Sequence, residues 1–266
     1  MTKTLLENID AIPALPETIQ AVERVYQDED STFEDMQKAI ENDPLLTADI
    51  LRIVNSPMYG MKSTITSMKQ AISLLGKETV RTFVVSSAVN SFKIDLSPYN
   101  MSVDDFKRAC DMQLALMINW IIRRQPKSLA QLGPASFLVD LGRVIIAKTL
   151  IEDSKVEEIQ NAMTNGSNIA KAEKEACGAQ TTDITATLFR KWNFDAEIIH
   201  VIRYSDDPDG TMDEDREKAA LLKAVRETVT PNGTITDESI AIAKETIEEF
   251  DLDLEGYERA LERVLN

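Results

Sequence analysis

Histidine is almost absent from this sequence, which has only His200 among its 266 residues. Most hydrolytic metal centres use several imidazole ligands, and Ser-His-Asp or Cys-His triads need a histidine base. Every such site would therefore depend on His200, which lies between Ile199 and Val201 in an apolar helical pattern. A lone histidine in this setting is more typical of a structural or surface residue, so the sequence argues against a histidine-based catalytic centre.

Cysteine and glycine are also scarce, with 2 and 9 residues respectively. Cys110 and Cys177 are too few for a disulfide framework, and they favour a reducing cytoplasm. Neither glycine-rich phosphate loop, GxxxxGK[ST] or GxGxxG, occurs. The N-terminus lacks the core of a signal peptide, and no apolar run approaches the roughly 18 residues that span a bilayer. We therefore expect a cytoplasmic protein with no membrane insertion and no cofactor.

Positive charge is in deficit, since the formal net charge is −16. The deficit is concentrated in residues 205–266, where 18 Asp and Glu stand against 7 Lys and Arg, a difference of −11. A field of this sign repels phosphate backbones, so we expect no nucleic-acid binding. Acidic helical faces are usually solvated surfaces, and a basic partner is the alternative interpretation.

The signals that are present are those of an all-α protein. Pro16 precedes one helical pattern, and Thr32 with Asp35 forms a capping box for a helix over residues 33–41. Asp43 followed by Pro44 is an N-cap with proline at the first helical position. Alternating strand patterns and internal repeats are both missing, so the fold class predicted is all-α.

Two further helical segments follow in the first hundred residues. Ser67 with Gln70 predicts a second capping box, and Gly76 closes that helix. The next run, ETVRTFVVSSAVNSF, is apolar over most of its circumference. Its valines could suggest a strand, but its length and its place among short capped helices favour a buried helix.

The break Ser97-Pro98-Tyr99-Asn100 predicts a boundary between two lobes. We divide the chain into an N-terminal helical lobe (1–97), a second helical lobe (98–210) and an acidic helical extension (211–266). Ser102 and Asp105 cap a long helix that stops before Pro126, and one apolar helix is expected through FLVDLGRVIIAKTL. Shorter amphipathic helices fill the remainder.

The short stretch NSPMYG, residues 55–60, ends the helix that begins at Pro44. Pro57 lacks an N–H and disfavours a helical Ser56, and Gly60 permits a turn. One interpretation is structural, with Asn55 or Ser56 bonding freed carbonyls while Tyr59 packs on the next helix. The other interpretation is that Asn55, Ser56 and Tyr59 shape a binding surface at the junction of the lobes.

Residues 14–89 resemble the signature half of the HDOD family, over nearly 80 positions without a large gap. The matching positions are Leu15-Pro16, Asp43-Pro44, Leu51-Arg52, Asn55-Ser56, Tyr59-Gly60, Ile65, Ser67, Ala71-Ile72, Leu75-Gly76 and Val80-Arg81. The resemblance implies a two-lobe helical domain whose C-terminal lobe is related to the HD-type phosphohydrolases.

The C-terminal half resembles that HD-type lobe more weakly, in a degenerate form. FLVDLGRVIIA is similar to the segment that carries the enzymes' His-Asp pair, with Asp140 retained. The positions of the enzymes' histidine ligands hold other residues here: Cys110 or Asp111, Val139, Thr181, Ser205 and Asp206. A metal-bound hydroxide needs an organised ligand set, which Asp140 alone does not supply. We therefore expect no metal site and no catalytic residue.

The resemblance implies a non-catalytic module of bacterial signal transduction that acts through protein contacts. The implied partners act in trans and are a kinase, a receiver, a cyclic-dinucleotide enzyme or a transcriptional regulator. Two alternatives stay open. One is a divergent metal-dependent phosphohydrolase with carboxylate ligands. The other is a small-molecule or nucleotide sensor in which Arg52, Arg81 or Arg203 contacts the ligand, because guanidinium groups suit phosphate recognition.

Overall fold

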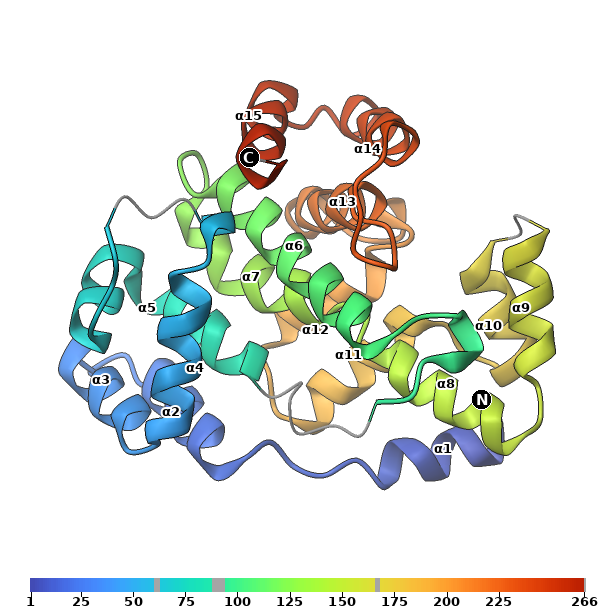
Figure 1. The fold of residues 1–266 in the computed structure, drawn as a ribbon, viewed down its shortest axis with the longest axis horizontal. Coiled ribbons are helices and arrows are strands. Elements are labelled where there is room, and N and C mark those ends of the chain that lie inside the picture. Colours follow the sequence, from blue (N-terminus) through green and yellow to red (C-terminus); the bar gives the residue numbers. More distant parts are fainter. Residues whose placement is uncertain (60–62, 88–93, 166–167, 266) are drawn as a thin grey trace. The chain divides into compact units, whose positions relative to one another are not determined.

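The computed structural model describes residues 1–59, 63–87, 94–165 and 168–265. Within these ranges the secondary structure consists of α-helices and short 3₁₀ turns, without a strand, so the all-α prediction is confirmed (Figure 1). The chain forms two compact units built from interleaved segments. Unit 1 comprises Met1–Ala14, Lys93–Gln113 and Leu138–Leu252, and unit 2 comprises Leu15–Phe92, Leu114–Phe137 and Asp253–Asn266. The predicted division at residues 97 and 210 stays a prediction, since it divides the chain into consecutive segments whereas the two units are built from interleaved ones.

Unit 2 begins with the helices that carry the N-terminal signature. They are α2 (Glu17–Gln27), α3 (Phe33–Glu41), α4 (Pro44–Val54) and α5 (Met68–Ser86), joined by the 3₁₀ turn η1 (Pro57–Tyr59). The predicted capping box of Thr32 and Asp35 is present, and the Asp43 carboxylate accepts from the first turn of α4. These caps satisfy N–H groups that a helix start leaves open, so they fix where α3 and α4 begin.

The helix α5 contains the two segments that the sequence separates at Gly76. Gly76 has φ of +82°, and this left-handed conformation kinks the helix. Ser67 caps the start by accepting from the Gln70 N–H. The following apolar run is helical and buried from Thr79 to Ser86, as expected, and its last residues and Gly60 lie outside the described ranges.

Helix α6 (Val103–Ile121) contributes to both units, and α7 (Leu129–Leu138) leads to α8 (Gly142–Glu152). The expectation of one helix through FLVDLGRVIIAKTL is wrong, because the chain turns at residues 139–141. Pro134 lies inside α7. The turn places Asp140 between the two helices, where its carbonyl accepts from the Arg143 N–H at 3.0 Å.

Unit 1 contains the remaining helices apart from the last. They are α1 (Lys3–Asp10), α9 (Val156–Thr164), α10 (Ile169–Cys177), α11 (Thr181–Lys191), α12 (Ala196–Tyr204), α13 (Asp213–Thr228) and α14 (Asp237–Glu249). The helix α15 (Leu254–Leu265) belongs to unit 2. The sequence reasoning missed α1, although Thr2 caps it.

The segment Pro126–Glu152 corrects the expectation that no stretch is long and apolar enough to span a membrane. By length and composition it qualifies, since it contains an 18-residue window with a mean hydropathy of 1.4, and 89% of that window is buried. The two helices α7 and α8 share this segment. A buried core helix passes the same test of composition, so the hydropathy alone is weak evidence for a membrane span.

Arg81 is the main polar anchor inside unit 2. Its side chain is fully buried, and its guanidinium makes two hydrogen bonds to the Glu23 carboxylate, at 2.8 and 2.7 Å. A third N–H donates to the Ala130 carbonyl at 3.1 Å. Within α7, Pro134 has no N–H to offer that carbonyl, so Arg81 supplies the missing donor. One side chain thus ties α2, α5 and α7 together.

Methionine resembles the unbranched apolar stem of the Arg81 side chain but has no N–H donor. The substitution therefore leaves the Glu23 carboxylate and the Ala130 carbonyl without this partner. We expect Arg81→Met to lower the free energy of unfolding by about 3–5 kcal/mol, the usual effect of removing one partner of a buried ion pair. Urea unfolding followed by circular dichroism measures the loss.

The matched control is Arg52→Met, because Arg52 lies in the same unit and its side chain is 71% exposed beside Asp49. We expect its effect to stay within about 0.5 kcal/mol. A loss of less than about 1 kcal/mol for Arg81→Met would show that the buried pair contributes little beyond a surface pair.

Candidate functional site

The retained Asp140 lies in a buried ionic cluster of unit 1. We call the set Gln113, Asp140, Arg143, Asp206 and Arg226 the Asp140 cluster. Its members come from α6, the turn between α7 and α8, the start of α8, the turn after α12, and α13. The turn before α8 places Asp140 three residues ahead of Arg143, on the same face of the chain.

The Asp140 carboxylate is held from three directions. Oδ1 accepts from Arg143 Nη2 at 3.2 Å and from Arg226 Nη2 at 3.1 Å, and Oδ2 accepts from Gln113 Nε2 at 3.0 Å. Burial raises the pKa of this carboxyl, but the guanidinium groups of Arg143 and Arg226 outweigh it and bring the pKa down to about 2. Asp140 is therefore ionised at neutral pH, with its charge already compensated.

Asp206 completes the charge balance of the cluster. Its carboxylate accepts hydrogen bonds from Arg226 Nη1 at 2.5 Å, from the Thr182 hydroxyl at 2.6 Å and from the Gln180 amide at 3.1 Å. Burial raises its pKa, yet the Arg226 cation and the hydroxyl of Thr182 leave the pKa below its ordinary value. Two carboxylates therefore face two guanidiniums, so the cluster is formally neutral.

A second buried carboxylate, Glu173, lies on the other side of Arg143. It accepts from the Tyr99 hydroxyl at 2.8 Å and from the Thr181 N–H and hydroxyl at 2.7 and 2.8 Å. Burial raises the pKa of Glu173 in spite of these donors and of Arg143. The Tyr99 ring lies under the Arg143 guanidinium, 5.5 Å from its centre. Thr181 thus bonds Glu173 through both its backbone N–H and its hydroxyl.

Gly142 brings α8 close to α11 at this point. Its N–H donates to the Thr185 hydroxyl at 2.8 Å. A Cβ at this position would lie 2.2 Å from the Thr181 carbonyl oxygen, a distance that real side chains do not adopt. The close approach explains why glycine follows the Asp140 turn, and it fixes Thr181 and Asp140 on adjoining elements.

The cluster also contains buried polar atoms that are not paired. Gln113 Oε1, Arg143 Nε and Arg226 Nε are enclosed and have no hydrogen-bond partner among the described residues. Such orphaned atoms are rare in folded proteins. Here they include two guanidinium donors, which leave the cluster with an excess of N–H groups over acceptors.

The residues do not fit the divalent metal that the resemblance to HD-type enzymes implies. Asp140 already accepts from two cations and an amide, Val139 is apolar, and burial holds the Cys110 pKa well above its usual value. Ser205 is buried and donates to the Ile202 carbonyl at 2.9 Å. Within the described residues, no group of three or more His, Cys, Asp and Glu side chains is arranged to hold a metal ion.

The residues of the NSPMYG stretch serve the architecture of unit 2. The Asn55 amide donates to the Leu51 and Ile65 carbonyls at 2.7 and 2.8 Å, and its oxygen accepts from the Ile65 N–H at 2.8 Å. Tyr59 is buried, with its ring 5.1 Å from that of Phe83 in an edge-to-face arrangement. Ser56 is half-buried. These contacts support the structural interpretation, and a binding role for Asn55, Ser56 and Tyr59 stays a prediction.

The three candidate arginines do not form one site. Arg52 is exposed on α4, and a ligand would reach Arg81 only by displacing Glu23. Arg203 lies in unit 1, beside Arg190 and His200 in a surface groove of about 260 Å³. The His200 ring is 2.7 Å from the Thr211 hydroxyl. Ligand contacts by these arginines stay predictions.

The sequence reasoning missed Gln113, Arg143, Glu173 and Arg226. Arg143 stands three residues after Asp140, a spacing that favours ion pairs, so it had a local signal. Arg226 pairs with Asp140 across 86 positions and lies among charged residues on α13, where nothing in the sequence distinguishes it.

Comparison with known proteins identifies relatives of the whole fold. The family model of the HDOD domain matches residues 12–208. An uncharacterized protein of Treponema pallidum (strain Nichols) is 22% identical over 211 residues, which are 77% of this chain and 39% of that protein. The chain therefore spans well under half the length of that curated relative.

Two solved structures share the fold at low sequence identity. A proposed phosphohydrolase from Shewanella amazonensis SB2B is 20% identical with a TM-score of 0.71, over 99% of this chain and 94% of that one. A proposed signal transduction protein from Marinobacter aquaeolei VT8 is 20% identical with a TM-score of 0.70, over 100% of this chain and 59% of that one. At these identities the likeness concerns the fold alone.

The ionic cluster predicts a specific dependence of stability on pH. The folded pKa of Asp140, about 2, lies below its ordinary value of 3.8, so the ionised form stabilises the fold. That contribution, about 2 kcal/mol, is present above pH 4 and is lost as the pH falls towards 2. We expect Asp140→Asn to be less stable than the wild type at pH 7, and the difference to shrink below pH 4.

Urea unfolding of both proteins between pH 7 and pH 3 measures this difference. Asp49→Asn, which removes the acidic partner of the exposed Arg52, is the control, and we expect it to stay within about 0.5 kcal/mol of wild type. A gap between wild type and Asp140→Asn that is the same at every pH would contradict the assignment of the charge pair.

Proposed function

The chain belongs to the HDOD domain family, and from that premise we propose that it is a non-catalytic regulatory module of bacterial signal transduction. In this proposal it acts through contacts with other proteins. The observation that carries the proposal is the state of Asp140, whose carboxylate accepts from Arg143, Arg226 and Gln113. The one carboxylate retained from the enzymes' ligand set thus has a structural task.

The charge balance of the cluster explains why that task and metal binding compete. The carboxylates of Asp140 and Asp206 are offset by the cations of Arg143 and Arg226. A divalent ion at Asp140 would meet two guanidinium groups at hydrogen-bond distance and would have to displace them. The cost of leaving those cations buried and unpaired opposes such a displacement.

A neutral, hydrogen-bonded cluster has a use in a protein that presents surfaces to partners. It joins α6, α8 and α13 of unit 1, so the faces of those helices are held in a fixed arrangement. The proposal places the chain in the same class of role as a proposed signal transduction protein that shares its fold. We infer partners in trans, such as a kinase, a receiver, a cyclic-dinucleotide enzyme or a transcriptional regulator, in the cytoplasm.

Metal content and hydrolysis test the proposal directly. We expect the full chain, purified without tags or chelators after supply of manganese, iron, zinc and magnesium, to hold substoichiometric metal by elemental analysis. We also expect no hydrolysis of p-nitrophenyl phosphate or bis(p-nitrophenyl) phosphate above the background without protein. Crosslinking in cells then identifies the protein partners.

Asp140→Asn is the matched variant for both measurements. Any trace of hydrolysis in the wild type should persist in Asp140→Asn, because a contaminant would be its source. One or two firmly held metals per chain, or hydrolysis that disappears in Asp140→Asn, would contradict the non-catalytic role and favour the phosphohydrolase alternative.

A further inference from the structure

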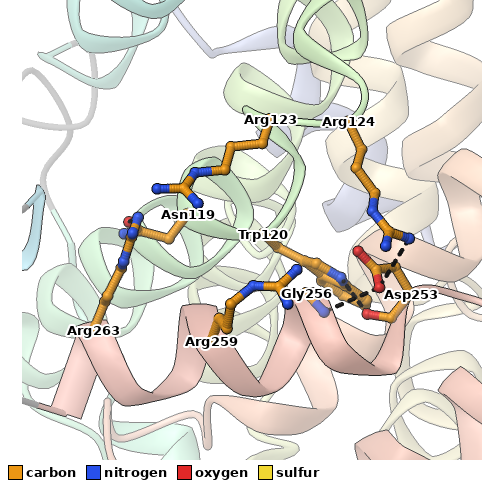
Figure 2. Close-up of a pocket in the computed structure, with 8 residues that line it drawn as sticks. All are labelled: Asn119, Trp120, Arg123, Arg124, Asp253, Gly256, Arg259 and Arg263. Carbon is orange, nitrogen blue, oxygen red and sulfur yellow. Dashed lines mark hydrogen bonds and ion pairs between the residues drawn. The ribbon is translucent and has the colours of Figure 1, made fainter.

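Unit 2 has a surface hollow that is lined by arginines. Arg123 and Arg124 follow the end of α6, and Arg259 and Arg263 lie one turn apart on α15. Figure 2 shows Arg123 and Arg263 extending toward one another beside Asn119, with Arg259 between the two elements. Four guanidinium groups thus gather at one place on a chain whose net charge is −16.

Ordinary structural roles account for only part of this gathering. Cations at the end of a helix are favoured by its dipole, which covers Arg123 and Arg124. Arg124 also pairs with Asp253 at 3.0 Å, and Arg259 pairs with Glu255 at 2.5 Å. Arg263 lies in the last turn of α15, where the dipole of that helix favours a cation. None of these roles requires arginines of the two elements to line the same hollow.

Two of the four cations are not matched by a carboxylate. Arg263 donates only to the Asn119 side-chain oxygen, at the long distance of 3.4 Å. Arg123 forms no ion pair or hydrogen bond with the described part of the chain. Like charges held in one hollow repel one another, and an anion between them would remove that repulsion. The unmatched pair therefore indicates an anionic ligand.

The floor of the hollow is rigidly built. Trp120 is buried and its indole N–H donates to the Asp253 carbonyl at 2.9 Å. The Asp253 carboxylate accepts the Gly256 N–H at 3.0 Å, and a Cβ on Gly256 would lie 2.1 Å from that carboxylate. These contacts fix the start of α15 against α6, so the positions of the arginines on both elements are defined in advance of binding.

The size of the hollow restricts the ligand. The hollow is shallow and partly open to solvent, with about 20 Å³ of space inside it, so a bound ligand would leave its larger part outside. Guanidinium groups pair with phosphoryl oxygens through parallel hydrogen bonds. The acidic surface elsewhere disfavours extended polyanions such as nucleic acids. A compact dianion that projects from a larger molecule fits these constraints.

We propose that Arg123 and Arg263, with Arg124 and Arg259 beside them, form a binding site for a phosphoryl dianion. The phosphoryl group is carried either by a small phosphorylated molecule or by a phosphorylated side chain of a protein. The site lies in unit 2 and uses none of the residues of the Asp140 cluster. It therefore stands independently of the non-catalytic role proposed above.

The test is a titration of the full chain followed by ³¹P nuclear magnetic resonance and isothermal titration calorimetry. The probes are inorganic phosphate, ADP, and a blocked Gly-phosphoserine-Gly peptide with its unphosphorylated form. We expect the wild type to bind phosphorylated probes and to ignore the unphosphorylated peptide. The double variant Arg123→Ala/Arg263→Ala should bind at least about tenfold more weakly, since it loses two charge-assisted contacts.

The matched control is Arg24→Ala/Lys171→Ala, which removes two exposed cations, one on α2 and one on α10, that line neither hollow. This variant has the same net charge as the test variant and should bind the probes as the wild type does. Tighter binding of ADP than of the peptide assigns the site to a small phosphorylated molecule, and the reverse assigns it to a phosphorylated protein segment. Binding of inorganic phosphate alone supports the phosphoryl site without the larger contacts.

Two results would overturn the proposal. One is the absence of binding of every phosphorylated probe at millimolar concentration by a wild-type protein that is folded by circular dichroism. The other is equal weakening in the two double variants, because that result would show a general effect of net charge. Circular dichroism of both variants confirms that weaker binding does not reflect unfolding.

Discussion

The structure of unit 1 depends on keeping the Asp140 charge compensated in a buried place. A carboxylate taken out of water is costly unless cations and donors replace the solvent. Arg143 supplies one cation from the next turn of the chain, and Arg226 supplies the other from α13. Because Arg226 also holds Asp206, helices that are far apart in sequence are fastened at one point. The same pairing occupies both oxygens of the Asp140 carboxylate.

The comparison of sequence with structure shows which signals are local. Thr32 with Asp35 and Asp43 with Pro44 set helix starts within a few residues, so those starts could be predicted. The turn at Asp140 could not, since the apolar pattern of FLVDLGRVIIAKTL continues through it. What breaks the pattern is tertiary: the close contact of Gly142 with α11 and the pairing of Asp140 across the unit.

The candidate site shows the same division. Asp140 was identified from the sequence through a family resemblance, and the low number of histidines limited what it could do. The partners that decide its role come from other elements, and Arg226 on α13 looks like any surface arginine of a charged helix. A single sequence carries no signal for such a pair, because the attraction depends only on where folding places the two side chains.

Arginine has three different tasks in this chain, and burial and partners distinguish them. Arg81 is enclosed and donates to Glu23 and to the carbonyl that Pro134 leaves open, so it serves the fold. Arg226 balances the buried carboxylates of Asp140 and Asp206, so it serves the charge balance of unit 1. Arg123 is exposed and unmatched within the described chain, so its charge remains available to a ligand. Residue type alone therefore predicts affinity for anions, and only the surroundings decide whether the anion belongs to the protein or comes from outside it.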